Sequence, residues 1–161
     1  MVFFMTRDAN LGDLDFIQTL SENAFADRGS YGRIIRSLVQ CGLNKPTYNK
    51  TVVEAIIDDS QQLGFGIIEF RAERESYIPA IAVNPESYRS GIGRRLLTRL
   101  VELSRERDDS RVTLHVARDS PAHDMFAKFG FKQLPGGGFK YPTGVEAIKM
   151  SLDLELPPLL L

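Results

Sequence analysis

The chain has 161 residues, of which 43% are hydrophobic and 25% are charged, the length and balance of one ordinary globular domain. Its formal net charge of −1 and pI near 6.1 give no overall attraction for nucleic acid or for an anionic membrane. The one cysteine, Cys41, rules out an internal disulfide and suits a reducing compartment, and no apolar run reaches the roughly 18 residues of a transmembrane helix. We therefore expect a single domain over residues 1–161, located in the cytoplasm, with no metal and no membrane or nucleic-acid partner.

The first third of the chain predicts a strand followed by two helices. An apolar run over residues 2–6 is typical of a strand, and Asn10 to Asp13 supply turn and capping residues. Apolar residues then recur at helical spacing from Leu14 to Phe25 and again from Tyr31 to Val39. Cys41 ends the second apolar stripe, so we expect it to be buried.

Strands dominate the next part of the chain. Residues 52–57 and 63–70 flank a polar turn and predict an antiparallel hairpin, and residues 77–83 predict the following strand. Pro79 lies within that strand and has no amide donor, so we expect a bulge or an irregular ladder there.

The remaining elements alternate between helix and strand. A helix is expected after Gly91, a strand over residues 111–116, a helix from Pro121 to Gly130, and two strands over residues 131–134 and 145–154. A loop, residues 135–138, separates the last two strands. This order of elements predicts one α/β domain with a mixed sheet.

The segment Ser90-Gly91-Ile92-Gly93 is the most informative motif, because it joins a strand and tight turn to an amphipathic helix. Its glycines let the backbone approach a ligand, and the first amides of the helix have no intrahelical partner, so a phosphate suits this loop. The pattern is neither the Rossmann fingerprint nor a P-loop, which disfavours nucleotide hydrolysis. A turn that merely needs positive φ explains the glycines equally well.

Two stretches resemble a known family. Residues 81–97, IAVNPESYRSGIGRRLL, resemble the acetyl-CoA-binding signature of the GNAT superfamily of N-acetyltransferases, and residues 114–131, LHVARDSPAHDMFAKFGF, resemble its later strand and helix. The resemblance implies a single GNAT-like domain with a mixed, mostly antiparallel sheet of about seven strands and about four helices. It also implies acetyl-CoA as the acetyl donor and, as acceptor, a primary amine of a protein N-terminus or a small molecule.

The same resemblance assigns the donor site. It implies that acetyl-CoA is bound by Ala82, Val83, Arg89, Ser90, Gly91, Ile92, Gly93, Arg94, Asp119 and Phe126. The chain departs from the family pattern at Tyr88, where Arg or Gln is usual, and at Phe126, where a catalytic Tyr is common. A phenyl ring has no proton to give, so Phe126 cannot protonate the departing thiolate.

Two residues are candidates for catalysis. His115 has an unperturbed pKa of about 6.5, and strand alternation directs it away from its apolar neighbours, so it suits a general base near neutral pH. Residues 140–150 are similar, more loosely, to the ending of ribosomal-protein N-terminal acetyltransferases, which implies that Tyr141 faces the acceptor. A histidine that packs on the sheet and an ordinary loop tyrosine are the alternatives.

The sequence also leaves two alternative functions and one mode of assembly to consider. A catalytically inactive acyl-CoA-binding or sensing module would keep the fold and explain Phe126 and Tyr88. Nucleic-acid binding is suggested only by six arginines between residues 89 and 107, and the slightly negative net charge argues against it. The apolar tail, residues 156–161, is a candidate surface for a homodimer.

Overall fold

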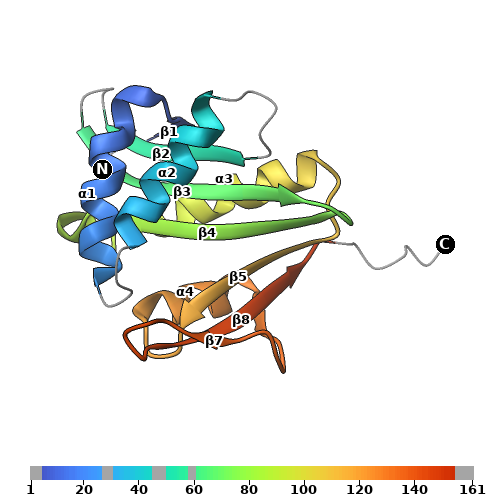
Figure 1. The fold of residues 1–161 in the computed structure, drawn as a ribbon. Coiled ribbons are helices and arrows are strands. Elements are labelled where there is room, and N and C mark those ends of the chain that lie inside the picture. Colours follow the sequence, from blue (N-terminus) through green and yellow to red (C-terminus); the bar gives the residue numbers. More distant parts are fainter. Residues whose placement is uncertain (1–4, 27–30, 45–49, 58–60, 155–161) are drawn as a thin grey trace.

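One mixed β-sheet organises the protein (Figure 1). The computed structural model describes residues 5–26, 31–44, 50–57 and 61–154. The strands in these residues are β1 (Met5–Asp8), β2 (Lys50–Ile57), β3 (Gln61–Arg71), β4 (Glu75–Val83), β5 (Arg111–Ala117), β6 (Lys132–Gln133), β7 (Phe139–Lys140) and β8 (Glu146–Asp153). Their order in the sheet is β1-β2-β3-β4-β5-β8-β6, and β7 also pairs with β8. Every pair is antiparallel except β4 with β5.

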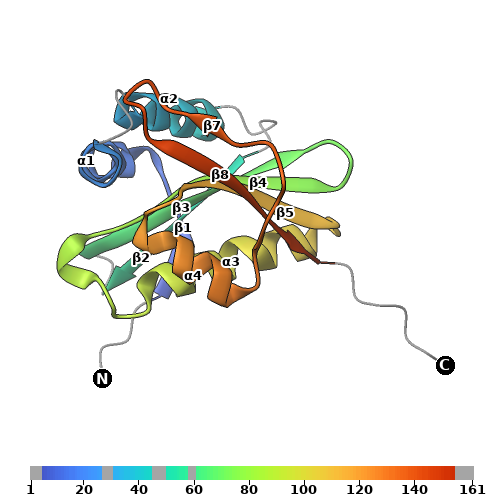
Figure 2. The same ribbon diagram turned by 90° about the horizontal axis from the view of Figure 1, so that it is seen from below.

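Within the described residues, four α-helices cover the two faces of the sheet. They are α1 (Leu14–Ala24), α2 (Tyr31–Asn44), α3 (Ile92–Glu106) and α4 (Pro121–Phe129). Helices α1 and α2 lie on one face and α3 and α4 on the other, as the view from below shows most clearly (Figure 2). The predicted α/β class and mostly antiparallel sheet are confirmed. The described residues contain an eighth strand, β7, which the sequence did not predict. Phe139 and Lys140 lie in the connection between the last two predicted strands, and they pair with the start of β8.

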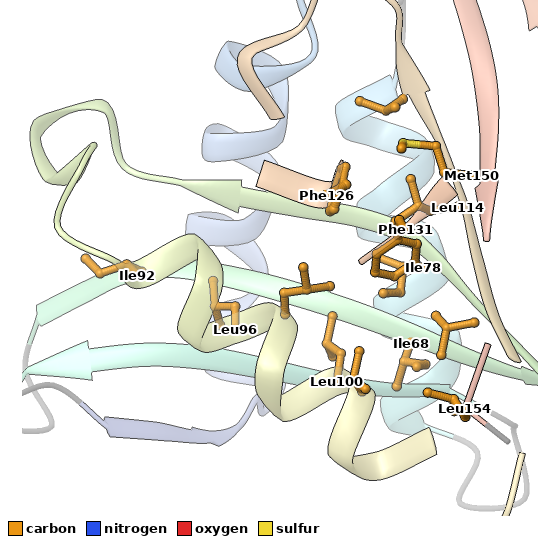
Figure 3. Packing of buried hydrophobic residues seen from close by; sticks show 14 of the residues in the cluster. Ile68, Ile78, Ile92, Leu96, Leu100, Leu114, Phe126, Phe131, Met150 and Leu154 are labelled. Carbon is orange, nitrogen blue, oxygen red and sulfur yellow. The ribbon is translucent and has the colours of Figure 1, made fainter. Parts of the chain in front are cut away.

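The larger hydrophobic core lies between the sheet and the α3–α4 layer (Figure 3). Ile92, Leu96 and Leu100 recur at helical spacing and point from α3 toward the sheet, where each is at most 3% exposed. Truncating a fully buried leucine to alanine typically costs about 2 to 5 kcal/mol, so this face fixes α3 firmly. The start of α3 is therefore held in place beside β4.

A bulge interrupts β4 where the sequence predicted one. Ile67 of β3 pairs with Ala80, whereas Glu69 pairs with Tyr77, so β4 contains one more residue than β3 across this stretch. The parallel ladder between β4 and β5 ends at the pair Ile78 and Leu114. Beyond it the two strands diverge (Figure 1). Pro79, which cannot donate to a ladder, lies at this point.

The interpretation of Cys41 as a buried residue is wrong, because its side chain is exposed. Helix α2 buries Ile35 and Val39 and runs on to Asn44. At 100° per residue, Cys41 lies about 200° around the helix from Val39, on the opposite face.

The candidate homodimer surface, residues 156–161, falls outside the described residues. None of the helices in the described ranges is both long and apolar enough to cross a membrane.

Candidate active site

The start of α3 is open in front of its first amides. Gly91 is the N-cap residue, with φ +86°, and no side chain caps the helix. A Cβ atom at Gly91 would meet no atom within 4 Å, so its backbone conformation, rather than crowding, requires glycine there. The glycine two residues on serves packing, because a Cβ at Gly93 would lie 3.1 Å from the sulfur of Met125. The unpartnered amides and the open space together form a cradle for an anion.

Positive charge surrounds this cradle. Arg89, Arg94 and Arg95 are exposed, and none of them forms an ion pair within the described ranges. Arg99 and Arg107, farther along, both pair with carboxylates. Arg89 also adopts φ +64°, a conformation that is costly for a residue with a side chain. The unpaired guanidinium groups favour a phosphate-bearing ligand over a neutral one.

A cavity of about 650 Å³ leads from the cradle into the gap between β4 and β5. Its lining includes the small side chains of Ala80 and Ala82 on β4, Met125 and Phe126 of α4, and Phe25, which follows α1. The sequence-predicted residues that line it are Ala82, Val83, Arg89, Gly91, Ile92, Gly93, Arg94, His115 and Phe126.

Three predicted residues do not line this cavity. The hydroxyl of Ser90 donates to the carbonyl of Ser87. Asp119 lies in a neighbouring cavity of about 650 Å³, which also contains Glu146. Tyr141 is buried on the turn after β7.

His115 is held at both ring nitrogens. Its Nε2 lies 2.7 Å from the carbonyl oxygen of Gly137, and its Nδ1 lies 2.7 Å from the hydroxyl oxygen of Tyr77. A carbonyl only accepts, so in the neutral ring Nε2 carries the hydrogen and Nδ1 accepts from the phenol. Tyr77 therefore faces the basic nitrogen.

The pKa of His115 is lowered from 6.5, chiefly because burial disfavours the charged ring. The hydrogen bond to Gly137 acts in the opposite direction, and the positive charges of Lys149 and Arg71 lower the pKa further. His115 is accordingly neutral at pH 7, the form that can accept a proton.

The two candidate catalytic residues belong to one row of aromatic rings. Phe139 lies 4.9 Å from His115 and 4.9 Å from Tyr141, measured between ring centroids, so it separates the two. Tyr77 completes the row at 5.6 Å from His115. No sequence pattern indicates Tyr77 as a site residue, because its contact with His115 depends on the parallel register that places Tyr77 opposite Thr113.

Phe126 contributes a hydrocarbon wall. It is 6% exposed and meets Phe131 edge to face at 5.8 Å. No proton for a leaving group can come from this position.

The anion cradle and the cavity beside β4 suit a ligand that carries phosphates, and comparison with known proteins identifies the family. The model of the Acetyltransferase (GNAT) family matches residues 18–131, so the chain belongs to that family. Its relatives include a protein of Bacillus subtilis (strain 168) called putative [ribosomal protein bS18]-alanine N-acetyltransferase, 27% identical over 132 residues and covering 81% of each chain.

A second relative is the Cysteine-rich protein 2-binding protein of Mus musculus, 40% identical over 58 residues. That match covers 36% of this chain and spans only 7% of the relative's length.

Solved structures confirm the fold. A putative GNAT acetyltransferase from Desulfovibrio desulfuricans superimposes with a TM-score of 0.78 at 20% identity, covering 94% of this chain and 99% of the other. The PaiA N-acetyltransferase of Thermoplasma acidophilum, solved in complex with coenzyme A, gives a TM-score of 0.73 at 16% identity, covering 92% and 98%.

Proposed function

We propose that the protein transfers the acetyl group of acetyl-CoA to a primary amine, with the N-terminal amine of a protein or peptide favoured over a small molecule. The observation that carries the proposal is the single cavity that joins the open start of α3 to His115. Two comparisons support it: coenzyme A in the PaiA structure and a ribosomal-protein alanine as the acceptor named for the Bacillus subtilis relative.

The donor site would use mostly backbone. In this proposal the pyrophosphate of acetyl-CoA lies against the first amides of α3, with Arg89 and Arg94 supplying charge. The pantetheine arm runs from Val83 back along β4 toward Ile78, where the ladder with β5 ends, and a backbone amide of β4 near the bulge polarises the thioester carbonyl. Acetyl-CoA supplies the acetyl group, and its free thiol is the second product.

The acceptor amine would lose its proton through Tyr77. The phenol of Tyr77 donates to Nδ1 of neutral His115, so a proton taken up by the Tyr77 oxygen is passed on to the imidazole as the phenolic hydrogen moves. The thiol has a pKa of about 8.5, so it can leave as thiolate near neutral pH without an acid at Phe126. A water molecule then carries the proton from His115 to the thiolate, because Phe139 lies between His115 and Tyr141.

The neighbouring cavity suits the entry of an amine. It shares Ala24, Ser120 and Pro121 with the donor cavity, and Asp119 and Glu146 line its surface. Asp119 forms no ion pair within the described part of the chain, so its carboxylate can meet an incoming ammonium group.

The test is the release of CoA thiol from acetyl-CoA, measured with a panel of peptides that differ in their first residue and with small amines. We expect His115→Ala and Tyr77→Phe to lower kcat by about 100-fold to 10,000-fold, the usual contribution of positioned proton transfer. His123, the chain's other histidine, lies on α4 beside Asp124, so His123→Ala is the matched control and should keep the wild-type rate.

The sensing alternative makes a different prediction. A sensor would bind acetyl-CoA but release no thiol with any acceptor, and Phe126 is the observation that favours it. Acetyl transfer that depends on acceptor concentration and falls in both site variants would exclude pure sensing.

A further inference from the structure

Tyr88 is an exposed aromatic residue at the mouth of the donor cavity. The residue lines the cavity and is nevertheless 60% exposed. It follows a short 3-10 turn, Pro85–Ser87, and its amide donates to the carbonyl of Pro85 at 3.3 Å. Among the described residues, its ring and hydroxyl make no hydrogen bond or aromatic contact. The fold positions the backbone of Tyr88 and leaves more than half of the residue exposed.

The surroundings of Tyr88 match one kind of ligand. Arg89 and Arg94 line the same cavity without an ion pair among the described residues, and α3, whose first amides are open, begins at Ile92. Phosphates held there would leave the rest of a nucleotide at the cavity mouth, beside the exposed ring. The neighbouring Arg89 adopts a left-handed conformation, which a non-glycine residue keeps only where the surrounding chain imposes it.

We propose that Tyr88 is a stacking platform for the adenine base of the donor, so that this residue makes the enzyme prefer a nucleotide-bearing thioester to a bare pantetheine thioester. The inference rests on the proposed function, because it needs acetyl-CoA in the same cavity. An aromatic ring and a nucleobase stack through their flat faces, and removing the ring typically weakens binding about 5-fold to 150-fold. A side chain of Arg or Gln at this position would offer charge or hydrogen bonds in place of a flat hydrocarbon face.

Affinity measurements on two fragments of the donor separate the platform from other roles. Isothermal titration of CoA, pantetheine and adenosine 3′,5′-bisphosphate should show that Tyr88→Ala weakens CoA and the nucleotide by the same factor and leaves pantetheine unchanged. Tyr88→Phe keeps the ring and should retain wild-type affinity for all three. Ile34 on α2 is also a large exposed apolar residue, at 52%, so Ile34→Ala is the matched control and should change none of them.

A fluorescence experiment tests the stacking directly. The chain has no tryptophan, so Tyr88→Trp introduces a single indole. We expect CoA and the bisphosphate to quench its fluorescence and pantetheine to leave it unchanged.

Two results would overturn the platform while leaving the donor site intact. One is CoA affinity within twofold of wild type in Tyr88→Ala, and the other is an equal loss for CoA and pantetheine. Failure of the wild-type protein to bind acetyl-CoA or CoA at all would instead refute the proposed function itself.

Discussion

Placing a carboxylate at Gly91 tests the donor site most directly. Gly91 has φ +86°, and a residue with a side chain pays about 1 to 2 kcal/mol for a left-handed conformation. No atom lies within 4 Å of the added Cβ, so Gly91→Glu should fold and lose only about 3 to 6 °C in Tm for a domain of 161 residues. Acetyl-CoA at about 100 times its Kd adds about 2.7 kcal/mol to the wild type, or roughly 8 °C. The variant should lose this shift, because its carboxylate repels the phosphates.

The chain provides a matched control on another turn. Gly144 has φ +89° and also lacks any atom within 4 Å of an added Cβ, so Gly144→Glu carries the same backbone cost and the same charge. Gly144 lines the neighbouring cavity and not the donor cavity, so this variant should keep the full acetyl-CoA shift. Differential scanning fluorimetry with and without acetyl-CoA measures both variants. An undiminished shift in Gly91→Glu would refute the placement of phosphates at the start of α3.

Two further predictions concern stability. Since burial lowers the pKa of His115 below 6.5, the unfolded chain takes up the proton first, so the free energy of unfolding should fall as pH drops from about 7 toward that lowered pKa. His115→Gln should remove this part of the pH dependence, and parallel Tm curves for the two proteins would contradict it. Asp109, with its side chain 1% exposed, accepts hydrogen bonds from the hydroxyls of Ser76 and Ser104. Asp109→Ala should cost about 3 kcal/mol, roughly 9 °C in thermal melts, and a loss under 2 °C would show that the buried hydroxyls find other acceptors.

The sequence predicted best the features that follow from local chemistry. The spacing of apolar residues predicted α3, because a helix of 3.6 residues per turn brings residues three or four apart onto one face. Ile92, Leu96 and Leu100 are buried on that face as expected. The β4 bulge followed from Pro79, which lacks a donor whatever its neighbours. The glycine loop could also be predicted from local chemistry, because Gly91 has a positive φ that residues with side chains avoid.

Features that depend on register were not predictable in the same way. Tyr77 meets His115 only because β4 and β5 pair in one parallel register, and no pattern in either strand specifies it. The bond from His115 to the carbonyl of Gly137 requires the fold of a glycine-rich connection. Residues 139–140 form too short a strand for alternation to reveal. The roles of His115 and Tyr141 in catalysis stay predictions.

The extra residue in β4 also determines on which face of the sheet the β4 side chains lie. Shifting a strand by one residue sends its side chains to the opposite face, so the bulge reverses the alternation between Tyr77 and Ala80. Ile78 consequently packs with α3, whereas Ala80 and Ala82 pack on the α1 side, the face on which Tyr77 meets His115. In an uninterrupted strand Tyr77 would share a face with Ile81 and Val83 instead. The same local irregularity therefore lies where the β4–β5 ladder ends, and it places the phenol of Tyr77 on the same face of the sheet as Ala80 and Ala82, which line the donor cavity.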